Sequence, residues 1–200
     1  SSMWNSINSQ IVSNSNITLS AGNTGVLFVV SRMLLKTIES VSKPALAGLW
    51  PNEKNMNVVL DLGANVECDD KNLIDFSEMG SALYKALFPE DTPKVALLNI
   101  GSEEIKGTDT LKKAYTKLKE ISKYGDFEFN GFIEGNKITF GESNVIVTDG
   151  FTGNVALKTA EGTAKFITDS LKKSLTSTLF AKVSVPVSYT HLRAHETLLY

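Results

Sequence analysis

The sequence of 200 residues has few of the residues that common catalytic and structural sites require. It contains one cysteine, Cys68, which excludes an intramolecular disulfide framework and is typical of a reducing compartment. Both histidines, His191 and His195, lie near the carboxyl terminus, so Ser-His-Asp and Cys-His mechanisms are disfavoured. Their i, i+4 spacing lacks the glutamate of an HExxH helix and a third ligand, so no metal site is predicted.

Charge and hydropathy exclude further classes of partner. The net charge of -2 gives no electrostatic footprint for nucleic acid, which requires an extended basic surface. The most apolar segment, residues 26–35, is interrupted by Ser31 and Arg32 and is too short to span a bilayer. The first residues lack the basic and apolar regions of a signal peptide. We therefore expect a cytoplasmic chain with no nucleic-acid partner.

What the sequence does contain is a repeated unit of apolar strand, loop rich in Gly and Asn, and amphipathic helix. The unit begins near residues 17, 57, 94 and 144. Its strands near residues 57 and 94 are nearly all apolar, which is typical of strands covered on both faces. This alternation predicts an α/β fold with a parallel sheet between two layers of helices, an αβα arrangement. In such folds the loops after the strands gather along one edge, where ligands bind.

The same pattern predicts the positions of the elements. Helices are expected after the glycine turn at residues 22–25 to about residue 41, over residues 71–88, from residue 108 or 109 to about 121, and from about residue 155 to 180. Strands are expected at residues 57–62, 94–100, 127–133, 137–140 and 145–147, with an irregular crossing at residues 43–51.

Composition divides the chain into three regions. Residues 1–16 are rich in Ser and Asn without apolar periodicity, so we expect a disordered lead-in or sequence foreign to the protein. Residues 17–182 are expected to form a partial α/β domain. Residues 183–200 show neither a glycine loop nor the preceding helical pattern, and we expect them to be non-native.

The strongest candidate site is DGFTGN, residues 149–154, where a β-branched strand turns into a helix. Its two glycines would let the backbone come close to a ligand, and the new helix begins with unpaired amides. That chemistry suits an anion. The alternative is a tight strand-to-helix connection that binds nothing.

Three other loops favour the binding interpretation. SAGNTG (residues 20–25), DLGAN (61–65) and NIGSEEIKG (99–107) also place Asn, Gly or Lys at expected strand ends. A merely structural loop does not need this repeated amide and carboxamide chemistry. No GxxxxGK[ST] and no complete GxGxxG occur, so nucleotide phosphate is disfavoured and no cofactor is predicted.

Two features have simpler interpretations. Cys68 precedes Asp69 and Asp70, whose charges would raise the thiol pKa, so we interpret it as structural. The lysines of the helix after residue 108 are interpreted as a solvated face.

Taken together, the loops resemble a known family. SAGNTG, LDLGAN, LLNIGSEEIKG and VTDGFTGNVALKTAEG are similar, in order and spacing, to motifs of the bacterial phosphate acyltransferases of phospholipid synthesis, the PlsX family. The resemblance covers about residues 17–180. It implies the fold of the isocitrate dehydrogenase and phosphotransacetylase group. It also implies an enzyme that forms acyl phosphate from inorganic phosphate and the acyl chain of acyl-[acyl carrier protein].

The implied chemistry needs neither a histidine nor a covalent intermediate, because phosphate is a nucleophile and a thiolate leaves readily. Lys106 is expected to neutralise phosphate or the oxyanion, and Asp149 to orient the lysine or a phosphate proton. Phosphate and substrate contacts are expected from the glycine loops, the carboxamides and one further lysine: Asn23, Thr24, Asn65, Asn99, Gly101, Gly150, Phe151, Thr152, Gly153, Asn154 and Lys158.

The sequence also departs from that family. The family's DAMGGD strand before SAGNTG and its helical region after residue 180 have no counterpart, so we expect an internal fragment. Homodimerisation and peripheral membrane contact are implied for the complete protein. In GFIEGNK, residues 131–137, Phe132 and Lys137 stand where the family has a carboxamide and an acid.

Two alternative functions remain. One is a phosphotransacetylase that uses acyl-coenzyme A. The other is a non-catalytic α/β binding module that contacts an acidic carrier protein through Lys112, Lys113 and Lys117.

Overall fold

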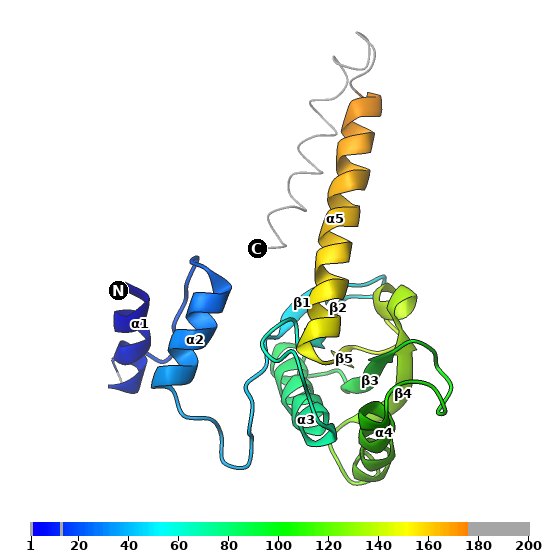
Figure 1. Ribbon diagram of the computed structural model, residues 1–200, viewed down its shortest axis with the longest axis horizontal. Helices are drawn as coiled ribbons and strands as arrows, with labels where there is room; N and C mark the ends of the chain where they lie inside the picture. The colour runs from blue at the N-terminus through cyan, green and yellow to red at the C-terminus, as the bar shows by residue number, and fades with distance from the viewer. Residues whose placement is uncertain (1, 13, 176–200) are drawn as a thin grey trace. The chain divides into compact units, whose positions relative to one another are not determined.

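The computed structural model describes residues 2–12 and 14–175. Figure 1 shows its elements, which in chain order are α1 (Ser2–Ile11), α2 (Thr24–Leu34), β1 (Gly48–Pro51), β2 (Met56–Leu60), α3 (Asp70–Leu87), β3 (Lys94–Asn99), α4 (Asp109–Ile121), β4 (Glu128–Glu134), the 3-10 helix η1 (Gly135–Phe140), β5 (Val145–Val147) and α5 (Gly150–Leu175). The chain divides into two compact units, and the boundary between Ala156 and Leu157 falls inside α5.

In the described part of the chain, five strands form a sheet of order β1-β2-β5-β3-β4. The last four run parallel, and β1 pairs with β2 antiparallel. Val147 of β5 lies opposite Leu60 of β2 on one side and Leu97 of β3 on the other. The carboxyl ends of these three strands therefore lie next to one another, and the predicted α/β fold class is confirmed.

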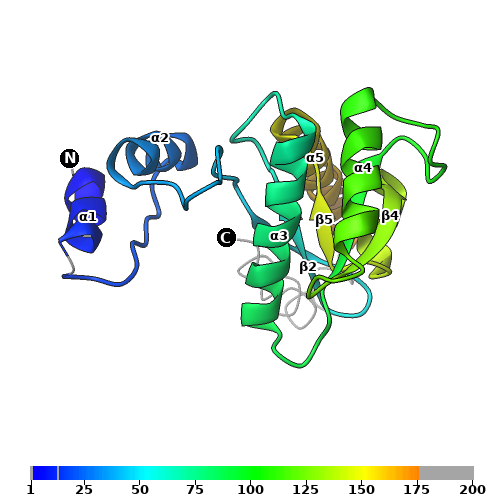
Figure 2. The ribbon, with the colours of Figure 1, turned by 90° about the horizontal axis from the view of Figure 1, so that it is seen from below.

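Helices α3 and α4 lie side by side on one face of the sheet (Figure 2). Alternate residues of the central strands point into this layer, because successive strand side chains face opposite sides. Burial of these apolar side chains is the main stabilising contribution to the first unit. The core is formed by Val58, Leu60, Leu73, Phe76, Tyr84, Val95, Leu97, Ala114, Leu118, Phe127, Phe132, Val145 and Val147.

Local capping explains where these two helices begin. The Asp69 side chain accepts a hydrogen bond from the Asn72 amide at 2.8 Å, and the Asn72 side chain accepts one from the Asp69 amide, a reciprocal capping box. Thr108 accepts from the Leu111 amide and so caps α4. The two predicted helices are confirmed, with bounds that differ by about one residue.

The opposite face of the central strands is also buried. Val59, Ala96 and Ile146 are at most 1% exposed. The sequence predicts a second helical layer there. Because α5 passes into the second unit at Leu157, that layer stays a prediction.

The sequence-based element assignments are wrong in the amino-terminal third. The predicted lead-in contains α1, which packs on α2 and buries Ile7. In the described chain no strand precedes α2. Ile17 and Leu19, where the strand was expected, are 69% and 83% exposed and form no strand pairing. The helix ends at Leu34 rather than near residue 41.

Two later segments were also assigned wrongly. The irregular crossing contains β1, whose Pro51 is tolerated because the strand lies at the sheet edge. The expected strand at residues 137–140 is η1, which buries Ile138. The predicted tail at residues 183–200 lies outside the described residues. Among the described helices, none is long and apolar enough to cross a membrane.

Leu118→Ala tests the core. Leu118 is fully buried in α4, so truncation should lower the free energy of unfolding by about 2–5 kcal/mol through lost burial and a residual cavity. Leu83→Ala is the matched control on α3, where the side chain is 39% exposed and the expected change is within about 0.5 kcal/mol. Urea denaturation followed by circular dichroism measures both. Equal losses would contradict the assignment of Leu118 to the core.

Candidate functional site

Three loops follow the neighbouring carboxyl ends of β2, β5 and β3: residues 61–65, 148–154 and 99–107. The strand register places these three loops along one edge of the sheet. The fourth loop that the sequence predicts there, residues 20–25, follows no strand in the described chain. In a parallel sheet this edge is the usual place for ligands.

Asp61 organises the first loop. Its carboxylate is fully buried and accepts five hydrogen bonds of 2.7–3.1 Å, from the amides of Leu46, Gly63, Ala64 and Asn65 and from the Asn65 carboxamide. A buried charge persists only when it is hydrogen-bonded this completely. Asp61 therefore has a structural role, and the sequence analysis did not single it out. The available signal was an acid directly after an apolar strand.

The first turn of α5 packs on this loop through two glycines. The Gly150 amide donates to the Asn65 carbonyl at 2.8 Å. A Cβ at Gly153 would lie 1.9 Å from the Asp61 carbonyl oxygen, and one at Gly150 would lie 2.6 Å from the Asn65 carbonyl oxygen. The glycines thus allow close approach to protein backbone, whereas the sequence predicts a close approach to a ligand.

Asp149 caps α5. One carboxylate oxygen accepts from the Thr152 amide and the other from the Thr152 hydroxyl, both at 2.8 Å. The Gly153 amide donates to the Asp149 carbonyl. The amides of Gly150, Thr152 and Gly153 are therefore already hydrogen-bonded within the protein.

Asn154 lies over the first loop. A Cβ on Gly63 would be 2.6 Å from the Asn154 carboxamide nitrogen, and Gly63 has a φ of +129°, a conformation that favours glycine. Phe151 is 62% exposed at the same helix start. The structure thus brings together residues 61–65 and 149–154.

Lys106 lies in the third loop and pairs with Glu103, with 3.0 Å between the ammonium and the carboxylate. The Asn99 carboxamide donates to the Lys106 carbonyl at 3.2 Å, and its oxygen accepts from the Ile100 amide. A Cβ on Gly101 would be 3.0 Å from the Lys106 ammonium, so this glycine makes room for the lysine. The Lys106 side chain is 46% exposed and available to a ligand.

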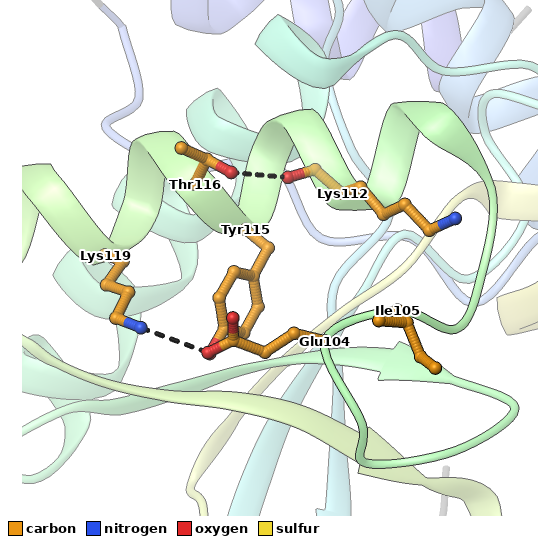
Figure 3. Close-up of a pocket in the computed structure, with 6 residues that line it drawn as sticks. All are labelled: Glu104, Ile105, Lys112, Tyr115, Thr116 and Lys119. Atoms are coloured by element: carbon orange, nitrogen blue, oxygen red, sulfur yellow. Dashed lines mark hydrogen bonds and ion pairs between the residues drawn. The ribbon is translucent and has the colours of Figure 1, made fainter.

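The same loop is joined to α4 through Glu104. Its carboxylate accepts hydrogen bonds from the Tyr115 hydroxyl and the Lys119 ammonium (Figure 3). These two bonds hold the pKa of Glu104 below its usual range. Burial, followed by the bond to Glu104, raises the pKa of Tyr115. A surface pocket of about 430 Å³ is lined here by Glu104, Ile105, Lys112, Tyr115, Thr116 and Lys119.

Several predicted site residues have local structural roles. Asn23 caps α2 by accepting from the Val26 amide, and Thr24 is the first residue of that helix. The Asn65 carboxamide donates to the Pro44 carbonyl and to Asp61, so its two hydrogens are already used. Lys158 pairs with Glu161 at 2.7 Å and belongs to the second unit.

Phe132 is a core residue. It lies in β4 and is 7% exposed, and its ring packs on Tyr115 with 4.8 Å between centroids. Lys137 lies in η1. The departure at Phe132 thus contributes to packing between β4 and α4.

Cys68 lies beside the first loop, and its thiol donates to the Asn65 carbonyl at 3.7 Å. Burial raises the pKa of Cys68, and the charges of Asp61 and Asp149 act in the same direction. The sequence predicts that effect from Asp69 and Asp70, but Asp69 caps α3 and Asp70 pairs with Lys117.

In the described ranges, no three His, Cys, Asp or Glu residues cluster in a way that could hold a metal ion. His191 and His195 lie outside the residues that the structure describes.

The chain is similar in sequence to known proteins. A sequence model of the family described as "Fatty acid synthesis protein" matches residues 1–195. The chain is 59% identical over 192 residues to a phosphate acyltransferase of Pelagibacter ubique, covering 96% of this chain and 57% of that protein. It is 45% identical over 184 residues to a phosphate acyltransferase of Maricaulis maris, covering 92% of this chain and 52% of that protein. The chain thus spans about half the length of these relatives.

Solved structures show the same fold. A phosphotransacetylase from Streptococcus pyogenes superposes with a TM-score of 0.63 at 15% identity, covering 81% of this chain and 55% of that one. The EutD phosphotransacetylase from Staphylococcus aureus gives 0.60 at 16% identity, covering 82% and 56%. The predicted phosphotransacetylase-like fold is confirmed.

Gly153→Ala should separate α5 from the first loop. The added methyl group meets the Asp61 carbonyl at 1.9 Å, so we expect a loss of about 1–3 kcal/mol in the free energy of unfolding. Gly162→Ala in the same helix has nothing within 4 Å and should stabilise by about 0.5–1 kcal/mol. Urea denaturation compares the pair. A neutral Gly153→Ala would contradict the close packing.

Cys68 should react slowly with iodoacetamide at neutral pH. Its raised pKa lowers the thiolate fraction, so the rate should increase only at a pH above that at which free cysteine ionises. A pH series of alkylation rates, with the urea-unfolded chain as control, measures this. An inflection below that of free cysteine would show that the thiol is activated.

Proposed function

The chain belongs to the family described as "Fatty acid synthesis protein", and we propose that the complete protein is a phosphate acyltransferase that forms acyl phosphate from a thioester and inorganic phosphate. Relatives at 59% and 45% identity that carry the name phosphate acyltransferase support this reaction. Activity, substrates and partners are proposed for the complete protein, since the chain spans about half of those relatives.

One observation carries the proposal: Lys106 and the start of α5 follow adjacent parallel strands. β3 and β5 are paired in register, so the loop that bears Lys106 and the loop that begins α5 emerge from the same edge. A lysine ammonium and a helix amino terminus both favour the binding of phosphate.

Hydrogen bonds within the protein limit which groups we assign to phosphate binding. Because the amides of Gly150, Thr152 and Gly153 are used within the protein, the donors we assign to phosphate are the Phe151 amide, the Asn154 carboxamide and the Lys106 ammonium. Gly150 and Gly153 hold the helix start against the first loop. Asn65, Asn99 and Gly101 position the loops that surround it.

These positions support the following reaction. A phosphate oxygen attacks the thioester carbonyl carbon, and the carbonyl oxygen gains negative charge in the tetrahedral intermediate. Lys106 stabilises that charge or the charge of the phosphate. The carbon–sulfur bond then breaks, the thiolate leaves, and acyl phosphate is the product. Asp149, with both oxygens on Thr152, fixes the helix start and orients the phosphate proton.

Acyl carrier protein is the proposed acyl donor. We also propose that the complete protein is a cytoplasmic homodimer that associates with membranes. The alternative is a phosphotransacetylase-type transfer from acyl-coenzyme A; the solved structures that share the fold are named phosphotransacetylases. A non-catalytic binding module is the third possibility.

Substitution of Lys106 and Asp149 tests the assignment in the complete protein. Lys106→Ala should lower kcat by about 100-fold through the lost charge stabilisation. Asp149→Asn keeps a capping side chain, so its thermal stability should be unchanged while kcat falls about 10-fold. Hydroxylamine trapping of acyl phosphate measures the rate, and Lys54→Ala, an exposed lysine outside the site, is the control.

The donor is varied in the same assay. We expect faster formation of acyl phosphate from acyl-[acyl carrier protein] than from acyl-coenzyme A, and the reverse order would favour the alternative. Unchanged rates in both variants would refute the residue roles, and no acyl phosphate from either donor would favour the binding module.

A further inference from the structure

The pocket in Figure 3 borders the most positively charged part of the chain. Residues 109–123 contain five lysines and two acidic residues, a net charge of +3 in a chain whose net charge is -2. This concentration of charge is local to α4 and the turn after it.

Three of these lysines form a group that we call the basic stripe: Lys112, Lys119 and Lys123. Lys112 and Lys119 are seven residues apart and lie on one face of α4, with Thr116 between them, and Lys123 lies in the turn that follows the helix. Asp109 and Glu120 lie beside that face. Within the described chain Lys112 and Lys123 form no ion pair, whereas Lys119 binds Glu104.

An exposed apolar residue lies next to the basic stripe. Ile105 lines the same pocket as Lys112 and Lys119 and is 82% exposed. In Figure 3 the Lys112 ammonium points away from Glu104. Ile105 directly precedes Lys106, and Glu104 fixes the shared loop to α4.

Charge complementarity indicates an acidic partner. An acidic helix with an apolar residue would place carboxylates on Lys112 and Lys123 and its apolar side chain on Ile105. Nucleic acid or a lipid surface fits less well, because the Glu104 carboxylate lines the pocket and only a short line of lysines is present.

We propose that the basic stripe and Ile105 form the docking surface for an acidic protein that carries the acyl group as a thioester. The proposal rests on the proposed function, because docking there brings the thioester to the loop of Lys106. Long-range attraction by exposed lysines increases the association rate and makes it dependent on salt.

Charge reversal in the complete protein tests the surface. Lys112→Glu with Lys123→Glu should raise KM for acyl-[acyl carrier protein] about 10-fold at low salt, with kcat unchanged and a weaker salt dependence. For the same acyl group on a pantetheine thioester, which has no protein surface, KM and kcat should be unchanged. Lys36→Glu with Lys54→Glu, which changes the charge equally elsewhere, should leave both donors unaffected.

Ile105→Ser tests the apolar part. The side chain is largely exposed, so folding should be preserved while kcat/KM for the protein donor falls about 3-fold. An equal rise in KM for both donors would assign the stripe to substrate binding and overturn the proposal. The proposal would also be overturned if the Lys112→Glu, Lys123→Glu variant and the Lys36→Glu, Lys54→Glu variant changed the kinetics of the protein donor equally.

A binding measurement tests the docking surface independently of the proposed enzymatic activity. Isothermal titration of the complete protein with acyl-free carrier protein should show about 10-fold weaker affinity for the Lys112→Glu, Lys123→Glu variant even if no acyl phosphate forms. Wild-type affinity in that variant would overturn the docking surface. If the variant instead lost binding only to phosphatidylglycerol vesicles, the stripe would be a lipid contact.

Discussion

The buried carboxylate of Asp61 is the interaction on which the rest of the site depends. An unpaired charge in a protein interior is strongly destabilising, so the surrounding amides must converge on it. Four backbone amides and one carboxamide do so, which holds residues 61–65 at the end of β2. Gly150 and Gly153 then let α5 begin in contact with that loop. The helix start is thereby placed at the edge of the sheet, and any ligand it binds is positioned by the same network.

The second part of the edge depends on a different type of contact. The Asn99 carboxamide joins the two ends of the loop that bears Lys106, and Gly107, with a φ of +90°, packs on that carboxamide. The exposed ion pairs of Glu103 and Glu104 add little to stability, because solvent screens the attraction between exposed charges. Their effect is to direct side chains: Glu103 holds Lys106, and Glu104 links the loop to the basic stripe on α4.

Polar residues at this edge thus divide into those that build the loops and those that stay available. Asn65 and Asn99 are hydrogen-bonded within the protein, as are the amides of Gly150 and Gly153. Lys106 and Asn154 remain exposed. Carboxamides and glycines in a strand-end loop therefore indicate a site in general, while their individual roles depend on partners that lie far away in the sequence.

By itself the sequence determined the parts of this protein that local physics controls. Apolar periodicity located α3, α4, β2, β3 and β5, and Thr108 marked the start of α4, because burial and capping depend on neighbouring residues. The loops of the site were located for the same reason. Tertiary structure alone decided that β5 lies between β2 and β3, that β1 joins the edge antiparallel, and that residues 137–140 form η1. These outcomes rest on hydrogen bonds between distant residues, such as Asn57 with the carbonyl of Ile138, 81 positions away, and no local pattern encodes such a pair.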